Sequence, residues 1–341
     1  MRLVQLYHPE KGRRIAKVEK DRLILFRERW DSTHQLFTDI IESARSPETF
    51  ISAELSSESA DYDNVYSGTS QWKLLPPFDH PDTHHACMLS GTGLTHRASA
   101  ENREKMHQKM SGQEEANITD SMKIYMWGEE GGKPKRGDIG VQPEWFYKGN
   151  GTHLKACGEP LIVPTYADDG GEEPEIAGLY LIARDGTPFR VGFAIANEFS
   201  DHVMEKKNYL YLAPSKLRNC SIGPELVVNG RFDDVPGVVS VERDGGTLWS
   251  KEIRTGEKNM CHSLENLEHH HFKYNQHRIP GTVHVHFFGA GAFTFGEGIE
   301  LKQGDRMSVS FEGYGRPLVN PLQIESGAPK LVKVKTPGQN S

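Results

Sequence analysis

Two apolar runs on either side of one tight turn constrain the fold of this chain more than any other feature of its sequence. The runs cover residues 176–183 and 189–196, and they flank the tetrapeptide Arg-Asp-Gly-Thr at 184–187. An Asp-Gly pair between apolar, β-branched runs is a strong signal for a β-hairpin. If Asp185-Gly186 forms a two-residue loop, the numbers of the paired residues sum to 371.

Three carboxylates come together at the open end of this predicted hairpin. The register places Glu173 opposite Glu198, with Glu175 on the same face one pleat away. Like charges directly opposite each other destabilise a hairpin, so a positive group is expected between them. A divalent cation held by oxygen ligands meets this need, and we expect no His or Cys nearby to favour zinc or copper. The alternative is a solvated acidic strand edge, because residues 171–174 could form a loop.

The segment 173–224 resembles the fumarylacetoacetate hydrolase superfamily. In that family an E-x-E pair opens a strand, a third carboxylate follows a G-[YF]-x-x-x-N run, and the three bind Mg²⁺, Mn²⁺ or Ca²⁺. Here the pair is Glu173 and Glu175, and residues 192–197 form the run that precedes Glu198. The family usually has Asp at the third position, so Glu198 is one methylene longer. The resemblance implies one divalent cation, most often Mg²⁺, bound by these three residues.

Further segments of the chain are similar to motifs of the same family. Residues 215–224 look like its lysine segment ending in Gly-Pro, residues 143–148 resemble its P-x-x-F-x-K segment, and residues 289–321 are similar to its closing motif. The resemblance covers roughly residues 70–322. It implies a mixed β-roll or β-sandwich catalytic domain.

The resemblance also implies roles for two lysines and one carboxylate. Lys216 and Glu173 are expected to be catalytic. A lysine beside a divalent ion and a carbonyl substrate can have its pKa lowered and act as a base, or stay charged and stabilise an enolate. Lys148 would offer a cation to a carboxylate or enolate oxygen of the substrate. The alternative for Lys148 is a surface lysine after a buried aromatic strand.

A glycine turn upstream is a candidate for binding an anionic substrate. Gly91 and Thr92 begin a segment that looks like a strand end, a turn and the start of a helix at 99–109, where backbone N–H groups can hold an anion. His96 lies at the mouth of this turn and could act as acid or base, or simply be a capping or surface histidine. The family's hydrolases have a Glu three residues after this His, whereas here the position is Ser99.

A second candidate substrate-binding turn follows a strand predicted at 283–288. Gly289 and Ala290 belong to a small-residue segment that allows backbone to approach a substrate closely. The pair His284 and His286 fits a core strand. The histidine-rich segment 261–271 suggests a metal site, but consecutive histidines point in different directions on a helix, so a structural role is favoured there.

Composition and charge exclude several classes of protein. With 36% hydrophobic and 26% charged residues in 341, the chain is typical of a soluble globular protein. A net charge of −7 argues against a nucleic-acid or anionic-membrane partner. We find no run near the ~20 apolar residues that span a bilayer, and no signal-peptide core at the start. Four scattered cysteines indicate reduced thiols, so a cytoplasmic location is expected.

The order of elements predicts an α+β fold, mainly β, rather than an alternating βαβ chain. We expect a small N-terminal α+β domain at residues 1–70 and a fumarylacetoacetate-hydrolase-like catalytic domain at 71–341, with a proline-rich boundary near 76–81. The predicted elements are strands at 3–7 and 22–26, a helix at 32–44, a loop at 56–68, and later helices at 99–109 and 259–274 among short, mostly antiparallel strands.

Three carboxylates and a lysine suit the chemistry of a small 2-oxo acid substrate. Such an acid can chelate a metal through its carboxylate and keto oxygens, which stabilises the enolate formed at C3. In the dehydratase branch of the family a 2-keto-3-deoxy sugar acid loses its C4 hydroxyl. In the hydrolase branch water breaks a C–C bond of a diketo acid.

The sequence favours the dehydratase branch. Residues 220–224 after Lys216 resemble the sugar-acid dehydratases, and the missing His-x-x-Glu spacing agrees. The expected reaction converts a 2-keto-3-deoxypentonate, such as 2-keto-3-deoxyarabonate, to 2-oxoglutarate semialdehyde in non-phosphorylative sugar catabolism. The alternatives are a C–C hydrolase of a 2,4-diketo-3-deoxy sugar acid and a non-catalytic sugar-acid-binding protein, which would not need Lys216. Dimers are common in the family, so a homodimer is expected.

Overall fold

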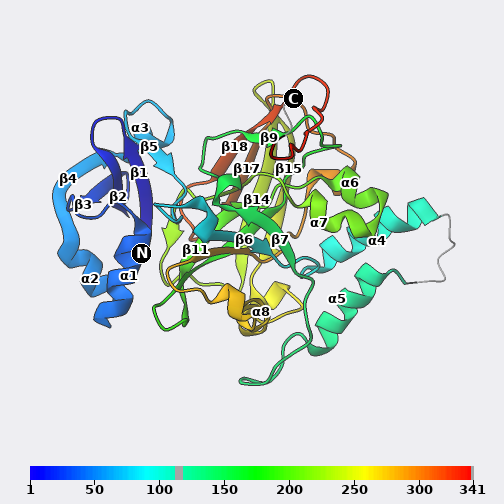
Figure 1. Cartoon of the computed structure of the whole chain (residues 1–341), viewed down its shortest axis with the longest axis horizontal. Coiled ribbons are helices and arrows are strands. Elements are labelled where there is room, and N and C mark those ends of the chain that lie inside the picture. The colour runs from blue at the N-terminus through cyan, green and yellow to red at the C-terminus, as the bar shows by residue number, and fades with distance from the viewer. Residues whose placement is uncertain (112–117, 339–341) are drawn as a thin grey trace.

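The computed structural model describes residues 1–111 and 118–338, with the side chains of 105–111 left aside. Most strands belong to one large mixed sheet, whose order is β4-β3-β2-β1-β13-β11-β10-β16-β6-β7, with β5, β8 and β12 paired beside this path (Figure 1). Its strands are β1 Arg2–His8, β2 Gly12–Glu19, β3 Arg22–Phe26, β4 Leu55–Asp61, β5 Lys73–Leu75, β6 Cys87–Gly91, β7 Phe146–Asn150, β8 Leu154–Lys155, β10 Pro174–Ile182, β11 Pro188–Asn197, β12 Cys220–Ile222, β13 Leu226–Val227 and β16 Val283–Phe287.

A second sheet has five strands in the order β15-β14-β17-β18-β9. Its strands are β9 Leu161–Val163, β14 Val235–Arg243, β15 Gly246–Thr255, β17 Arg306–Phe311 and β18 Leu318–Ile324. The helices lie around these sheets (Figure 1), and their bounds are α1 Thr33–Ser43, α2 Pro47–Glu54, α3 Tyr62–Tyr66, α4 Arg97–Ser111, α5 Asp120–Gly131, α6 His202–Lys207, α7 Leu212–Ser215 and α8 Leu264–Phe272. The predicted α+β fold, mainly β, is confirmed.

The central hairpin, β10 and β11, lies where the prediction placed it, but its loop is longer. Ala183 and Thr187 pair through the Ala183 N–H, and Gly186 donates to the Ala183 carbonyl, so the loop contains residues 184–186. Gly186 has a φ of +84°, the left-handed conformation typical of a three-residue hairpin loop with a glycine bulge. The predicted two-residue loop is therefore wrong.

A β-bulge farther along the hairpin corrects the register before it reaches the carboxylates. Near the turn Tyr180 pairs with Arg190, whereas Leu179 pairs with Gly192, so one extra residue is accommodated in β11. Beyond the bulge the pair Glu175 and Ala196 sums to 371, as predicted. The register predicted for the acidic end of the hairpin is thus confirmed.

The hairpin is buried on both faces. All nine residues of β10 are buried. One face, including Ile176 and Ile182, packs with the apolar residues of the five-stranded sheet, and the other, including Leu179, packs in a cluster shared with helix α1. Full burial of each such side chain stabilises the fold by about 1.5–3 kcal/mol, so the hairpin is a rigid support for what it carries.

The N-terminal segment forms the blue lobe in Figure 1 and is joined to the central sheet by β1. Leu3 of β1 pairs with Leu226 of β13, and β13 in turn pairs with β11. The Tyr62 hydroxyl adds a buried hydrogen bond of 2.9 Å to the Glu225 carboxylate. The division into domains 1–70 and 71–341 stays a prediction.

Several predicted elements are confirmed and others are wrong. Helix α1 and strands β1 and β3 match their predicted ranges. The predicted loop at 56–68 is instead occupied by β4 and α3. Strand β4 is an exposed polar edge strand, and the Asp61 side chain caps α3, whose Tyr62 is buried. The helix expected at 259–274 begins only at Leu264, where Ser263 supplies the cap. No helix in the described ranges is long and apolar enough to cross a membrane.

Candidate functional site

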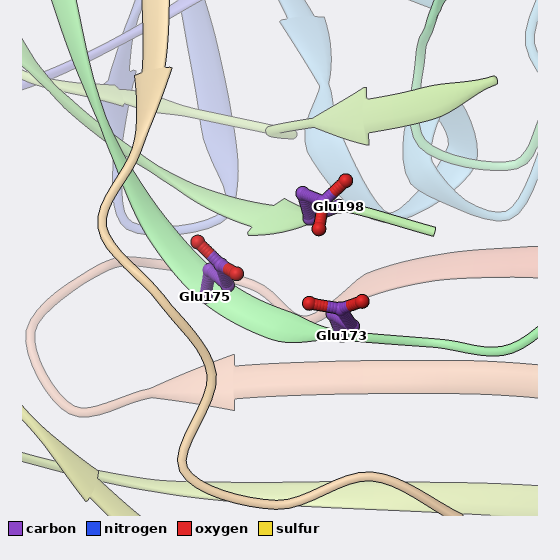
Figure 2. Close-up of side chains that lie close together, drawn as sticks. All are labelled: Glu173, Glu175 and Glu198. Carbon is purple, nitrogen blue, oxygen red and sulfur yellow. The ribbon is translucent and has the colours of Figure 1, made fainter. Parts of the chain in front are cut away.

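The three predicted carboxylates converge at the open end of the central hairpin. Glu173 immediately precedes β10, Glu175 lies within it, and Glu198 immediately follows β11. The Glu198 N–H donates to the Glu173 carbonyl at 3.0 Å, which sets the two ends side by side. One carboxylate oxygen from each residue lies within 4.8 Å of the others, and Figure 2 shows the three groups pointing toward one another.

Two buried lysines contact this cluster. Lys216 Nζ lies 2.6 Å from Glu173 Oε1, 2.7 Å from Glu198 Oε2 and 3.0 Å from Ser200 Oγ. Lys148 Nζ lies 2.6 Å from Glu198 Oε1 and also donates to two backbone carbonyls. Each ammonium therefore has three protein acceptors. Lys148 was expected to face a substrate, and here it holds Glu198; a substrate contact stays a prediction.

Burial and mutual repulsion set the protonation of the carboxylates. Burial, together with the charge of Glu173, raises the pKa of Glu198 to about 7 against the opposing effect of the lysines. Burial and both neighbouring carboxylates raise the pKa of Glu175 well above its ordinary value. Burial also acts on Glu173, but Lys216 and His202 outweigh it and hold that pKa well below its ordinary value. Burial lowers the pKa of Lys216, but Glu173 and Glu198 outweigh it and raise that pKa.

The donor set suits a hard divalent cation. Three carboxylate groups offer oxygen ligands only, and oxygen is what Mg²⁺, Mn²⁺ and Ca²⁺ prefer. Glu175 and Glu198 are almost fully buried, and a bound dication would offset the like-charge repulsion that raises their pKa values. The solvated acidic edge considered from the sequence does not describe these side chains.

A histidine beside the cluster was missed by the sequence reasoning. His202 Nε2 lies 3.0 Å from Glu173 Oε1, so the expectation that no His lies nearby is wrong. Its ring stacks on Phe293 and Phe295, with centroid separations of 5.0 and 5.2 Å. His202 opens helix α6, which Asp201 caps, and an Asp-His pair that begins three residues after Glu198 was the available signal.

A second charged group, missed entirely, lies beside Lys216. Arg103 of α4 contacts Glu144 Oε1 at 2.6 Å and Glu205 Oε1 at 2.8 Å. All three side chains are buried, and the charge of Lys216 acts on Glu144. Burial raises the pKa of Glu144 although Arg103 opposes it. Glu144 Oε2 is buried and has no hydrogen-bond partner in the described part of the chain.

The glycine turn places His96 between two threonine hydroxyls. His96 Nδ1 lies 2.9 Å from Thr95 Oγ1, and Nε2 lies 3.1 Å from Thr255 Oγ1, so both ring nitrogens contact hydroxyls. Burial lowers the pKa of His96 to about 4. Its proposed acid–base role stays a prediction.

The other candidate substrate-binding residues support the site from two turns. Gly289 donates its N–H to Glu175 Oε2 at 2.6 Å, which fixes that carboxylate, and Ala290 beside it is buried. Thr92 contacts the buried His286 at 2.9 Å, and Gly91 packs its Cα against the ring of Phe146. A substrate contact of these four residues stays a prediction.

Comparisons with known proteins give relatives in sequence and in fold. No family model matches the sequence. A curated protein of Haloferax volcanii, described as a probable 2-keto-3-deoxyxylonate dehydratase, is 26% identical over 179 residues, which cover 51% of this chain and 58% of that protein. The aligned part thus spans little more than half of the length of that relative.

Solved structures match almost the whole chain in fold. A hexagonal crystal form of 2-keto-3-deoxyarabinonate dehydratase has a TM-score of 0.70 at 16% identity and covers 96% of this chain and 100% of that one. A complex of 2-keto-3-deoxy-D-arabinonate dehydratase with magnesium and 2,5-dioxopentanoate has a TM-score of 0.69 with the same identity and coverage. A 5-carboxymethyl-2-hydroxymuconate delta-isomerase from Mycobacterium smegmatis has a TM-score of 0.55. The chain therefore has the fold of the fumarylacetoacetate hydrolase superfamily, and along nearly its whole length this fold matches the solved 2-keto-3-deoxyarabinonate dehydratases.

Proposed function

We propose that this protein is a metal-dependent hydro-lyase that dehydrates a 2-keto-3-deoxypentonate. The observation that carries the proposal is the convergence of Glu173, Glu175 and Glu198 beside Lys216. The fold shared with 2-keto-3-deoxyarabinonate dehydratases and the partial sequence match to a probable 2-keto-3-deoxyxylonate dehydratase support the same reaction class.

The three carboxylates would hold the cation, and we assign it as Mg²⁺, the ion present in one structure of similar fold. When bound, a divalent cation supplies electrophilic stabilisation of the negative charge that develops on a 2-oxo acid as its C3 proton leaves. The residues of the chain position these carboxylates: Gly289 holds Glu175, His202 holds Glu173, and Lys148 holds Glu198.

We assign removal of the C3 proton to Glu144 rather than to Lys216. Lys216 has three acceptors for its three protons, so it fits the second of its two expected roles, a fixed positive charge that stabilises an enolate. Glu144 Oε2 is a buried carboxylate oxygen without a hydrogen-bond partner in the described residues. A carboxylate with a free oxygen beside the charge of Lys216 suits general base catalysis.

The proposed reaction removes one water. The C3–H electron pair forms the C3–C4 double bond as the proton passes to Glu144, and the C4–O bond breaks. The C4 hydroxyl leaves with one proton as water. The resulting enone keeps its C5 hydroxyl and tautomerises to 2-oxoglutarate semialdehyde, which is the same compound as the 2,5-dioxopentanoate in the solved relative.

A C–C hydrolase of a diketo acid is the second candidate. It would need a base that activates water, and His96 is the residue expected for that role. The ring nitrogens of His96 contact Thr95 and Thr255 instead of a carboxylate, which favours dehydration. A non-catalytic sugar-acid-binding protein would require neither Lys216 nor the free oxygen of Glu144.

The test is to incubate the purified protein and Mg²⁺ with a panel of 2-keto-3-deoxypentonates and 2,4-diketo-3-deoxy acids. Formation of 2-oxoglutarate semialdehyde, followed by a coupled dehydrogenase, supports the proposal. Pyruvate and a hydroxy acid from a diketo substrate, without turnover of any 2-keto-3-deoxypentonate, would establish the hydrolase instead. Binding without turnover of either class would establish the binding protein.

A further inference from the structure

We propose that a buried block of three histidines, His271, His284 and His286, positions Glu144. This inference rests on the proposed function, because Glu144 is the residue to which we assign removal of the C3 proton. The histidines are positioning residues: they contact the neighbours of Glu144 from two sides. They come from helix α8 and strand β16, which the sequence reasoning had treated as structural.

The first contact runs through the residue after Glu144. Trp145 Nε1 donates to His271 Nδ1 at 3.1 Å, and the indole also stacks on the rings of His271 and His277. A tryptophan indole can only donate a hydrogen bond, so His271 Nδ1 must be the acceptor. Its proton then lies on Nε2, which contacts His284 Nδ1 at 2.9 Å. The tautomers of His271 and His284 are thereby fixed.

The second contact runs through the turn against which Glu144 packs. His286 Nε2 lies 2.9 Å from Thr92 Oγ1, and its Nδ1 lies 2.9 Å from Ser90 Oγ. Thr92 precedes Gly93, and a Cβ at Gly93 would lie only 1.8 Å from Glu144 Oε2. The free oxygen of Glu144 therefore rests directly on the backbone that His286 anchors.

The two contacts belong to one rigid unit. The rings of His271 and His286 have centroids 4.4 Å apart, and both side chains are only 1% exposed. His271 contacts Trp145 and His286 contacts Thr92, so the block fixes the distance between the segment before β7 that carries Glu144 and the turn against which Glu144 packs. Arg103 fixes the other carboxylate oxygen, Oε1. Oε2 has no hydrogen-bond partner of its own in the described residues and packs against Gly93, while the Tyr209 side chain also interacts with this carboxylate.

This arrangement predicts a loss of turnover rather than of binding when an anchor is removed. A displacement of about 1 Å of a reacting group can cost about 100-fold in rate. The metal carboxylates do not contact the histidine block, so affinity for Mg²⁺ and KM for the substrate should stay close to wild type. A purely structural role would instead make the loss of activity follow the loss of thermal stability.

The experiment compares four variants with wild type and Glu144→Gln, measuring kcat, KM and Tm with Mg²⁺ and a 2-keto-3-deoxypentonate. Trp145→Phe keeps the ring but removes the N–H, and His271→Leu removes the acceptor; both should lower kcat about 10- to 100-fold with KM within about 2-fold. His271→Asn restores an acceptor near the position of Nδ1 and should recover most of kcat. Phe272→Leu packs against His271 without touching Trp145 and should lower Tm but not kcat.

The outcomes separate this inference from the proposed function. Absence of dehydration by wild type refutes the proposed function, and the positioning role with it. An active wild type whose Glu144→Gln variant is inactive, but whose Trp145→Phe variant retains full kcat, refutes only the positioning role. The same holds if kcat follows Tm across all variants, Phe272→Leu included. The effects of Trp145→Phe and His271→Leu on kcat should not add in the double variant, because both changes break the same hydrogen bond.

Discussion

At the scale of single residues, the candidate site is a balance of buried charges. Glu175 and Glu198 are almost fully buried, as are Lys148 and Lys216. An isolated buried charge is very costly, whereas a paired and hydrogen-bonded one is tolerated. The positive charges of the lysines neutralise the carboxylates only in part, and a bound dication would supply the remaining positive charge. The site is therefore expected to respond strongly to changes at any one of its carboxylates.

Replacing one carboxylate should separate the metal site from the rest of the fold. Glu173→Gln keeps the shape of the side chain but removes a charged ligand, so Mg²⁺ affinity should fall at least about 10-fold and dehydration should be lost. Isothermal titration with Mg²⁺ measures the affinity. Glu172→Gln is the matched control: Glu172 is buried beside the site, yet its carboxylate holds Thr294. Equal Mg²⁺ affinity in Glu173→Gln and wild type would remove Glu173 from the ligand set.

The residues that sequence reasoning found are those whose partners are close in the chain. Glu173, Glu175 and Glu198 share one hairpin, so a local pattern was enough to bring them together. Arg103 and Glu144 lie 41 residues apart, and their contact depends on how α4 folds back onto the segment before β7. His202 was missed for a different reason: its link to Glu173 depends on the turn into α6, which no periodicity indicates.

At the scale of elements, the site depends on the register of one hairpin. The bulge opposite Leu179 restores the pairing that the longer loop had shifted, and a one-residue slip would turn Glu175 to the other face. The two apolar runs and the Asp-Gly signal predicted the hairpin. The bulge lies next to the residue of β11 that pairs with β13, Phe193, and no local pattern in the sequence indicates it. Strand β4 could not be predicted because it is a polar edge strand whose pairing partner, not its composition, defines it.

The bulge gives a direct test at Gly192. A Cβ there would lie 2.5 Å from the carbonyl oxygen of Val227, and the neighbouring β13 backbone cannot move aside without breaking its pairing. Gly192→Ala should therefore destabilise the protein by about 1–3 kcal/mol and weaken Mg²⁺ binding through the shifted register. Urea unfolding measures the first effect. The control Thr187→Ala, at the residue that follows the hairpin loop, should leave Mg²⁺ binding unchanged. A Gly192→Ala variant as stable as wild type would show that the bulge is not constrained.

The histidine block makes the stability of the folded protein depend on pH. Burial, together with neighbouring histidines, lowers the pKa of His284 and of His286 to about 3, and that of His271 well below its ordinary value. The unfolded chain binds protons at these sites near pH 6.5, before the folded chain does, so stability is complete above that pH and falls as the pH drops toward 3. Each neutral histidine contributes a slope of about 1.4 kcal/mol per pH unit. Urea unfolding from pH 7 to 4.5 checks this, and a flat profile in His286→Asn and wild type alike would contradict it.

At the scale of the whole molecule, the N-terminal lobe completes the core of the site-bearing sheet. Leu3 and Phe26 belong to the same apolar cluster as Leu179 of the central hairpin. The lobe also contributes Tyr62, which bonds Glu225, and Arg2, which pairs with the same carboxylate at 3.0 Å. The homodimer expected from the family resemblance stays a prediction, which light scattering of the purified protein would check.

Removing the lobe should therefore impair more than its own fold. Deletion of residues 1–70 would expose the β13 edge and the apolar face of β10, and we expect a poorly soluble protein without a cooperative thermal transition. Circular dichroism on heating and size-exclusion chromatography measure the result. A soluble fragment 71–341 with the wild-type Tm would show that the two parts fold independently.

The central claim is that the carboxylate cluster and Glu144 together make the C3 protons of a 2-oxo acid labile. The most direct measurement is proton NMR of 2-oxopentanoate, which has no C4 hydroxyl to lose, incubated with the protein in D₂O. We predict Mg²⁺-dependent exchange of the C3 protons, abolished by EDTA, by Glu173→Gln and by Glu144→Gln. Exchange that persists unchanged in EDTA or in both variants, or no exchange by a wild-type protein that binds Mg²⁺ and the acid, would contradict the account.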